Sequence, residues 1–229
     1  MDNRESTRND TGAVPPWLLL VELAVIAALF YGDVRHVVPF SKTPFLLLLG
    51  WLSLRLRNLR WQDVGLRRSE SWLKTILIGL AAGAGIELLE LFLTQPLLVQ
   101  LIGKMPDLSA FALLRHNVKL LLLALALTWT LAAFGEEMVY RGYLMNRLAG
   151  IGRNSRVAWA ASLIFVNVLF GSAHLGQGIT GMIENMIDGA LLGLLYLRRG
   201  RSLAAPIIAH GVTDTIDCLL LFLGHYPGV

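Results

Sequence analysis

The sequence has few charged residues, a single cysteine and no alternation of apolar with polar residues, and each of these absences excludes a class of protein. Charged residues make up 16% of the 229 residues, whereas soluble domains carry about 25%. Because Cys218 stands alone, neither an internal disulfide nor a zinc site built from several thiolates can form. The apolar runs are rich in Leu and Ala without a period of two, which disfavours β-strands. An all-α protein remains.

Apolar residues, by contrast, are abundant: they make up 55% of the chain, and its mean hydropathy is +0.60. A membrane-spanning helix needs about 20 residues. We therefore predict an all-α, polytopic transmembrane bundle of seven to eight helices that encloses a polar cavity. An eighth helix would lie around residues 106–116 or after Arg141. Residues 1–16 are predicted to be a flexible cytoplasmic tail and residues 17–229 a single membrane domain. The predicted spans are 17–32, 44–56, 72–94, 118–138, 156–173, 180–198 and 203–223.

The positive residues are distributed unevenly between the two sides of such a bundle. Lys and Arg concentrate in the cytoplasmic loops of membrane proteins. With the N-terminus inside, the outer segments contain only a few of the twenty: Arg35, Lys42, Lys104, Arg115 and Lys119. We therefore expect a multi-pass protein of the plasma (inner) membrane with a cytoplasmic N-terminus and, for seven spans, an outer C-terminus. The net charge of +4 then indicates contact with lipid headgroups and not with nucleic acid.

Acidic residues are unusually frequent within the apolar segments, where Arg141 is the only base placed comparably. Acids in lipid share protons, pair with His, hold a metal or face water. Their excess over bases therefore predicts the polar cavity. The acids in or at the ends of apolar segments are Glu22, Glu87, Glu90, Glu136, Glu137, Glu184, Asp188, Asp214 and Asp217.

Glu136 and Glu137 stand at the end of residues 120–135, a run without a formal charge, and Arg141 follows. An acid in mid-helix costs roughly 2.5–3.5 kcal/mol on insertion scales, so chemistry is the default hypothesis for the pair. On an α-helix Glu137 and Arg141 lie one turn apart and can form a charge-assisted pair. Glu136 points about 100° away and stays available as a general base. The simpler alternative is a cluster of charges at a helix end.

Two further motifs place histidines in apolar segments. Phe170 and His174 share a helical face at the end of the fifth predicted span, and His210 and Asp214 share one within the last. A lone His in such a place can equally be a core or interfacial residue, and the His–Asp pair can be a satisfied contact between helices. Gly189, in the sixth predicted span, is interpreted as a packing contact, because small residues let helices approach closely.

Taken in order, the three motifs resemble those of the CAAX-protease and bacteriocin-processing family of intramembrane proteases. They read Glu136-Glu137-x-x-x-Arg141, Phe170-x-x-x-His174 and His210-x-x-x-Asp214, and the resemblance covers about residues 118–217. It implies that residues 17–229 form an intramembrane endopeptidase domain. The implied partners are the lipid bilayer and a peptide or protein substrate at the membrane, which in eukaryotic members is a prenylated CAAX segment.

The same resemblance implies a role for each motif residue. Glu136 and His174 would activate water, His210 and Asp214 would complete the site, and Glu137 with Arg141 would hold its geometry. Eukaryotic-type members usually carry Asn at the position of Asp214. Asn can donate a hydrogen bond to an oxyanion and an ionised Asp cannot. Asp214 would therefore be protonated, bind a metal or orient His210.

The sequence does not decide whether the predicted protease needs a metal ion. Two histidines and one or two acids can supply a His₂Glu zinc set with an open position for water, and the family has been described both as metalloproteases and as metal-free glutamate peptidases. The His-Glu-x-x-His zinc helix does not occur in the sequence. We expect glutamate-activated water without an obligatory cofactor, with a divalent metal such as zinc as the alternative.

Two other functions fit the same residues. A non-catalytic membrane scaffold or bacteriocin-immunity factor would have the same fold, and a proton- or cation-coupled transporter would also carry intramembrane acids and histidines. At 1.5 Å per residue, straight helices would place Glu136 and His174 at depths that differ by about 10 Å. Helix tilt, a later start of the fifth span or a partly re-entrant segment at residues 169–181 would close that gap. The sequence indicates neither the substrate nor the oligomeric state.

Overall fold

The computed structural model describes residues 16–227, and most of these residues are helical. No strand occurs within those residues, so the prediction of an all-α fold is confirmed for them. The predicted tail at residues 1–16 lies outside the described residues except for Pro16, which begins α1. The longer helices are α1 (Pro16–Val34), α2 (Thr43–Leu56), α3 (Trp72–Leu89), α4 (Gln95–Ile102), α5 (Val118–Leu127), α6 (Asn146–Ile151), α7 (Arg156–Ser172), α8 (Gly178–Arg198) and α9 (Ala204–Leu223).

Shorter helical elements connect some of these helices without a break. The segment η2 (Glu90–Thr94) continues α3 into α4, and η4 (Thr128–Glu136) with η5 (Met138–Met145) continues α5 into α6. These three segments have the wider π-type turn, which is often found at functional sites. Short 3₁₀ helices are η1 (Trp61–Val64), η3 (Ser109–Leu114) and η6 (Leu175–Gln177).

Several helices begin and end at residues whose chemistry favours a boundary. The side chains of Ser71, Asn117 and Ser155 accept hydrogen bonds from the first turns of α3, α5 and α7, as N-cap residues do. Gly103 and Gly224 follow α4 and α9 with φ of 79° and 69°. Glycine adopts this left-handed conformation without strain and commonly ends helices.

Four helices are long and apolar enough to cross a membrane: Trp17–Val34, Trp72–Ile102, Val118–Ile151 and Ala204–Leu223. Helices α7 and α8 qualify together as a fifth, with a bend of 56° at the break between them, and Thr43–Leu56 is apolar but short. Within the described residues the chain is therefore a multi-pass membrane protein with four to five candidate spans. The predicted number of seven to eight stays a prediction.

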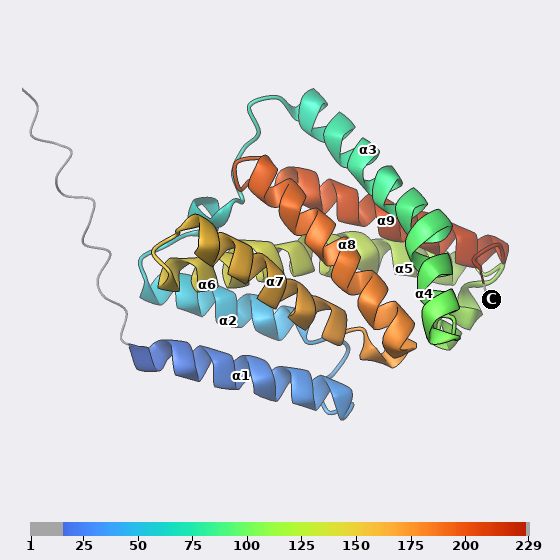
Figure 1. Cartoon of the computed structure of the whole chain (residues 1–229), viewed down its shortest axis with the longest axis horizontal. Helices are drawn as coiled ribbons and strands as arrows, with labels where there is room; N and C mark the ends of the chain where they lie inside the picture. Colours follow the sequence, from blue (N-terminus) through green and yellow to red (C-terminus); the bar gives the residue numbers. More distant parts are fainter. Residues whose placement is uncertain (1–15, 228–229) are drawn as a thin grey trace, which may run out of the picture.

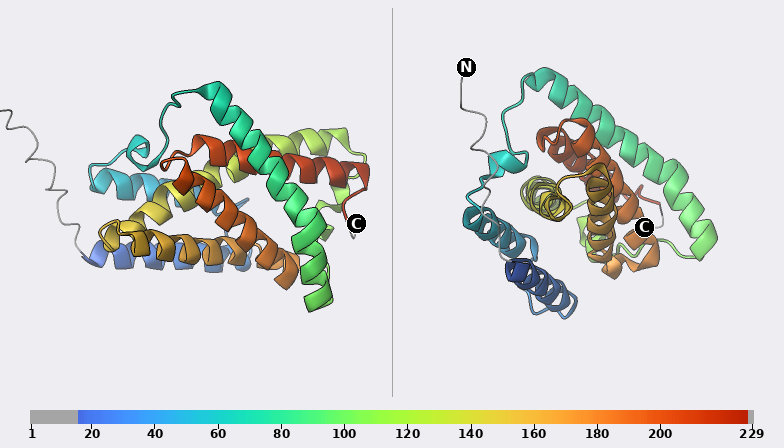
Figure 2. Two further views of the ribbon diagram at one scale, coloured as in Figure 1. Left: turned by 45° about the horizontal axis from the view of Figure 1, so that its top comes forward. Right: turned by 60° about the vertical axis from the view of Figure 1, so that its left-hand side comes forward.

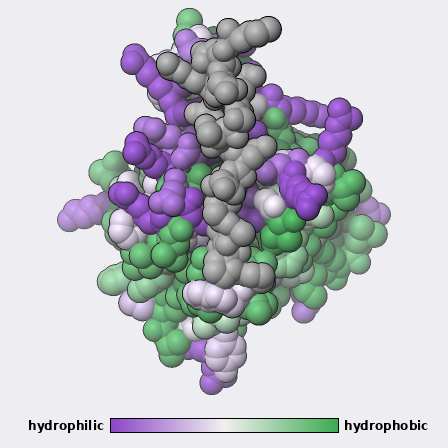
Figure 3. Space-filling view, turned by 90° about the vertical axis from the view of Figure 1, so that its left-hand side faces the viewer, coloured by the Kyte–Doolittle hydropathy of each residue, from purple (hydrophilic) through white to green (hydrophobic). Residues whose placement is uncertain are grey.

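The helices pack with α3 and α4 along one side, α1 at the opposite edge and the remaining helices between them (Figures 1 and 2). The connections α2–α3, α6–α7 and α8–α9 all lie at the end where α1 begins (Figure 1). Viewed from that end, hydrophilic side chains gather over the upper part of the face and hydrophobic side chains over its flanks (Figure 3). These three connections contain much of the chain's arginine, including Arg60, Arg153 and Arg199.

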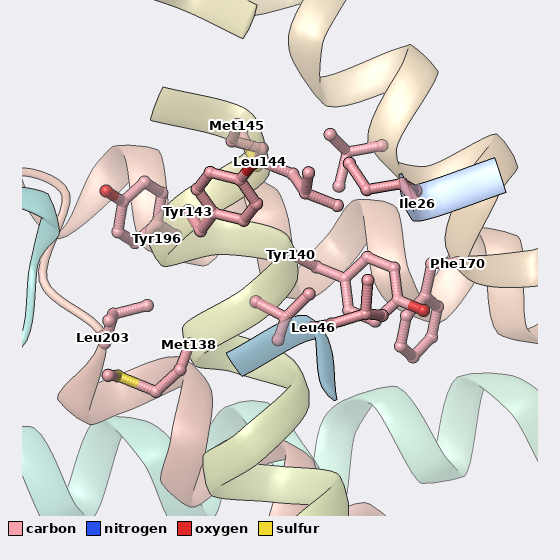
Figure 4. Close-up of a cluster of buried hydrophobic side chains, with 12 residues drawn as sticks. Ile26, Leu46, Met138, Tyr140, Tyr143, Leu144, Met145, Phe170, Tyr196 and Leu203 are labelled. Atoms are coloured by element: carbon pink, nitrogen blue, oxygen red, sulfur yellow. The ribbon is translucent and has the colours of Figure 1, made fainter. Parts of the chain in front are cut away.

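The largest cluster of buried apolar side chains surrounds η5, whose residues are buried throughout. Tyr140 and Phe170 lie next to Leu46 in this cluster, while Tyr143 and Tyr196 fill its other end (Figure 4). Fully burying an aromatic or aliphatic side chain stabilises a protein by roughly 1.5–3 kcal/mol. The cluster therefore fixes η5, and with it the polar residues at the start of η5, against α2, α7 and α8.

Two glycines let α3 approach α9 closely. A Cβ added at Gly79 would lie 2.6 Å from Ile208 Cβ, and one at Gly83 would lie 2.7 Å from Val212 Cβ and collide with the carbonyl oxygen of Ala209. Thr213 donates a hydrogen bond to the carbonyl oxygen of Gly83 at 3.2 Å. This close contact sets the rotation of α9, and α9 contains His210 and Asp214.

We predict that Gly83→Leu destabilises the fold because it forces α3 away from α9. Overpacking of this kind costs about 1–3 kcal/mol, which corresponds to a drop of several degrees in the melting temperature of the detergent-solubilised protein. Gly85→Leu is the matched control, since a Cβ at Gly85 meets nothing within 4 Å. Equal melting temperatures for the two variants would contradict the close α3–α9 contact.

Candidate active site

Glu137 is the centre of a buried polar cluster at the junction of η4 and η5. Its side chain is 0% exposed, and its Oε1 accepts a hydrogen bond from Arg141 Nη1 at 2.7 Å. The Nδ1 of His210 lies 3.0 Å from the same oxygen. A carboxylate paired with Arg only accepts hydrogen bonds, so Nδ1 of His210 carries the proton in this contact. One carboxylate therefore links η5 to α9.

Arg141 extends the cluster to two more helices. Its Nη2 donates to the carbonyl oxygen of Gly189 in α8 at 2.6 Å and faces Asn167 Oδ1 in α7 at 3.4 Å. The guanidinium also lies over the ring of Phe170, 4.9 Å from its centroid. A Cβ at Gly189 would stand 2.6 Å from Asn167 Oδ1 and 3.2 Å from Arg141 Nη2. Glycine is therefore needed at position 189.

Phe170 stands between the two histidines. Its ring centroid lies 5.0 Å from that of His174, 6.0 Å from that of His210 and 4.9 Å from that of Tyr140. The contacts with Tyr140 and His210 are edge-to-face, the arrangement that aromatic rings prefer. A single buried aromatic side chain thus sets the spacing between α7, α9 and η5.

His174 lies in the break between α7 and α8, where its Nδ1 is 3.0 Å from the carbonyl oxygen of Phe170. A carbonyl oxygen only accepts hydrogen bonds, so Nδ1 of His174 is the protonated nitrogen. In the neutral imidazole Nε2 is then left with a lone pair. The break in the helix therefore presents an acceptor nitrogen to whatever occupies the space beside it.

That space is a cavity of about 550 Å³. Glu136, His174, His210 and Asp214 line it, and no described residue forms a hydrogen bond with the half-buried carboxylate of Glu136. An apolar wall, which we define as Leu108, Phe111, Leu120, Leu123, Leu127 and Leu131, forms another part of the lining. The cavity thus combines titratable groups with a surface that suits hydrocarbon.

All six predicted site residues lie in this one region. Glu137 contacts both Arg141 and His210, and the cavity is lined by Glu136, His174, His210 and Asp214. Asp214 Oδ1 is 3.5 Å from Nε2 of His210, longer than most hydrogen bonds. The bend between α7 and α8 brings His174 to the cavity.

The titratable side chains of the cavity are also candidates for metal ligands. Among residues 16–227, no group of three or more His, Cys, Asp or Glu side chains is arranged to hold a metal ion. Nδ1 of His210 faces Glu137 and Nδ1 of His174 faces a backbone carbonyl oxygen, which leaves both Nε2 atoms available, as in histidines that bind metals. The expectation of glutamate-activated water without an obligatory metal therefore stays a prediction.

Comparison with known proteins assigns the segment that contains this cluster. A family model described as type II CAAX prenyl endopeptidase Rce1-like matches residues 118–216. Residues 118–216 are therefore similar to the Rce1-like family. The resemblance inferred from the three motifs is thereby confirmed. No curated protein and no solved structure matches the chain. The Rce1-like segment begins with α5 and ends within α9, and it contains all six predicted site residues.

Two residues of this polar cluster were not predicted from the sequence to belong to it. Asn167 is a polar residue in the apolar run of α7 and a partner of Arg141, and its isolation in that run was the available signal. Gly189 was interpreted as a packing contact. It does permit close packing, but its carbonyl oxygen also accepts a hydrogen bond from Arg141. Backbone acceptors have no sequence signature, so this second role could not be predicted.

We predict that Arg141→Met destabilises the protein by about 3–5 kcal/mol, because it leaves the Glu137 charge buried without its partner. The double variant Glu137→Gln/Arg141→Met should recover part of that loss, since no unpaired charge remains and Gln still accepts from His210. Unfolding free energies in detergent would measure both effects. Arg153→Gln, in the loop after α6, is the control. A double variant no more stable than Arg141→Met would contradict the buried ion pair.

Proposed function

We propose that this Rce1-like protein is an intramembrane endopeptidase that hydrolyses a peptide bond of a membrane-associated substrate, of CAAX type or other, with water activated by Glu136 and His174. One observation supports the proposal above all. A carboxylate without a described hydrogen-bond partner and two imidazoles face one cavity, beside a fully buried Glu137–Arg141 pair. The Rce1-like match to a protease family supports it independently.

In the proposed first step, a water molecule donates hydrogen bonds to the carboxylate of Glu136 and to Nε2 of His174. Glu136 takes one proton as the water oxygen bonds to the scissile carbonyl carbon. Protonated Glu136 then gives its proton to the leaving nitrogen as the C–N bond breaks. General-base catalysis of this kind contributes about 10²–10⁴-fold to the rate. Because Nδ1 of His174 faces a backbone carbonyl oxygen, the tautomer that accepts at Nε2 is held in place.

His210 is proposed to stabilise the oxyanion of the tetrahedral intermediate. A protonated His210 donates from both ring nitrogens, and Nδ1 already faces Glu137. Nε2 would then donate to the oxyanion, where charge-assisted hydrogen bonds contribute most to catalysis. Asp214, 3.5 Å from Nε2, would orient the ring before substrate binds. Glu137 and Arg141 keep the geometry and do not touch the reacting atoms.

The substrate is proposed to include a hydrocarbon chain. The apolar wall of the cavity presents leucines of α5 and η4 together with Phe111 of η3. Leu120, Leu123, Leu127 and Leu131 recur at helical spacing on one face. A prenyl or acyl chain along this wall would bury apolar surface at about 25 cal/mol per Å². The lipid chain would then hold the peptide bond beside Glu136 and His174.

We also propose a topology of seven passes with the N-terminus in the cytoplasm. The four longer candidate spans then supply four passes, and helices α2, α7 and α8 supply the other three by crossing or nearly crossing the bilayer. The uneven distribution of Lys and Arg supports this orientation, as does the arginine in the connections at the end where α1 begins.

We predict that Glu136→Gln lowers the rate of peptide cleavage by about 10²–10⁴-fold while the melting temperature stays at the wild-type value. Gln keeps the size of the side chain and cannot accept the proton. Cleavage of a fluorogenic farnesylated CAAX peptide by full-length protein in nanodiscs would measure the rate. The control is Glu70→Gln, an exposed acid outside the cavity. Wild-type activity in Glu136→Gln would rule out the base and favour a non-catalytic role.

For the topology, we predict that a membrane-impermeant maleimide labels Asp107→Cys in intact cells and labels Glu70→Cys only after lysis. Both substitutions are made in a Cys218→Ser background. Both positions are exposed, and they lie in connections at opposite ends of α3 and α4. Labelling in the reverse order would invert the proposed orientation, and equal labelling of both in intact cells would refute the crossing by α3 and α4.

A further inference from the structure

The cavity contains a second group of acids that the proposed mechanism does not use. We call this group the acidic pole and define it as Glu90, Glu184, Asp188 and Asp217, all of which line the cavity. They come from three elements, η2, α8 and α9.

Part of the acidic pole lacks partners even though it is buried. Glu184 is only 3% exposed, and its Oε1 has no hydrogen-bond partner among the described residues. Oδ1 of Asp217 is likewise buried and unpartnered within residues 16–227. Glu90 differs, because it accepts a hydrogen bond from the hydroxyl of Tyr226 at 3.1 Å. A buried polar atom without a partner costs about 1–3 kcal/mol, so Glu184 indicates a missing ligand.

Among the described residues, neither lysine nor arginine lines the cavity beside these acids. The described residues that line the cavity include six Asp and Glu side chains and neither Lys nor Arg: the acids are Glu90, Glu136, Glu184, Asp188, Asp214 and Asp217. Arg141, which contacts Glu137 behind the cavity, directs its Nη atoms to Glu137, Asn167 and Gly189 instead. The cavity therefore attracts a cation from outside the chain.

We propose that the acidic pole binds a cationic side chain of the substrate, an ammonium or a guanidinium, and so selects peptides with Lys or Arg near the cleaved bond. This inference rests on the proposed protease function and adds to it the class of peptide. Ammonium and guanidinium groups carry several N–H donors that reach separate acceptors. A bare metal ion fits less well, because no three of the described acids converge as metal ligands.

The position of the acidic pole limits where the cation can lie. Asp217 follows His210 by seven residues on α9, which is a rise of about 10 Å along the helix. An extended peptide covers that distance in about three residues, at 3.3–3.6 Å per residue. The selected Lys or Arg therefore lies within about three residues of the bond beside His210.

The test compares farnesylated peptides that differ at one position, scanned over three residues on each side of the cleaved bond. Lys, Gln and Glu are placed there in turn, and full-length protein in nanodiscs cleaves each peptide. At the best position, wild type should cleave the Lys peptide with kcat/KM at least about tenfold above that for Gln, as expected for a buried charge pair, and should cleave the Glu peptide least. Equal cleavage of the Lys and Gln peptides at every position would overturn the proposal.

The double variant Glu184→Gln/Asp188→Asn should lose the preference for Lys and retain cleavage of the Gln peptide. Its matched control is Glu70→Gln/Asp107→Asn, which removes two exposed acids outside the cavity. If the double variant fails to fold, Asp188→Asn alone replaces it. The comparison of Lys and Gln peptides with wild type still tests the charge preference. An undiminished preference for Lys in the folded double variant would overturn the assignment to these acids.

Binding of the same labelled peptides to Glu136→Gln separates this inference from the proposed function. If wild type cleaves none of the peptides but Glu136→Gln binds the Lys peptide more tightly than the Gln peptide, the protease is refuted and the acidic pole is supported as a cation site. Cleavage by wild type without any charge preference would support the protease and refute the cation site. Absence of both cleavage and binding would refute both proposals. A further arm adds Mg²⁺ or Ca²⁺ alone. If either ion raises the melting temperature of wild type but not of the double variant, the acidic pole is a metal site and the peptide assignment is overturned.

Discussion

The carboxylate of Glu137 is the acceptor on which the rest of the site depends. Oε1 faces both Arg141 and His210 and is fully buried, and removing one partner of such a pair costs about 3–5 kcal/mol. Through Arg141 the same carboxylate reaches Asn167 and Gly189. Segments η5, α7, α8 and α9 therefore meet around one negative charge, and their relative positions follow from satisfying it.

Two local features adapt ordinary helices to this charge. The π-type turns of η4 and η5 place Glu136 toward the cavity and Glu137 toward the interior. The bend between α7 and α8 turns His174 into the cavity and fixes one ring nitrogen on the carbonyl oxygen of Phe170. Both features expose a reactive group beside the buried pair, which is why a rigid cluster and an open cavity coexist.

The sequence predicted the helical class, the multi-pass membrane character and the family, because apolar run length and three ordered motifs are local signals. It also predicted the contact between Glu137 and Arg141, which follows from a four-residue spacing and persists in the π-type segment. The contact between Glu137 and His210 could not be predicted, since it depends on how α9 packs on η5 and α3. The predicted depth difference between Glu136 and His174 assumed straight helices, and the bend of 56° lies outside that assumption.

The ¹⁵N spectrum of the His210 side chain, in full-length protein in bilayers, tests the shared carboxylate most directly. The signal is assigned by its loss in His210→Gln, which separates it from the signals of the other four histidines among the five. The account predicts a protonated, hydrogen-bonded Nδ1 whose resonance moves when Glu137 is replaced by Gln. An unprotonated Nδ1, or a resonance unchanged by Glu137→Gln, would contradict it.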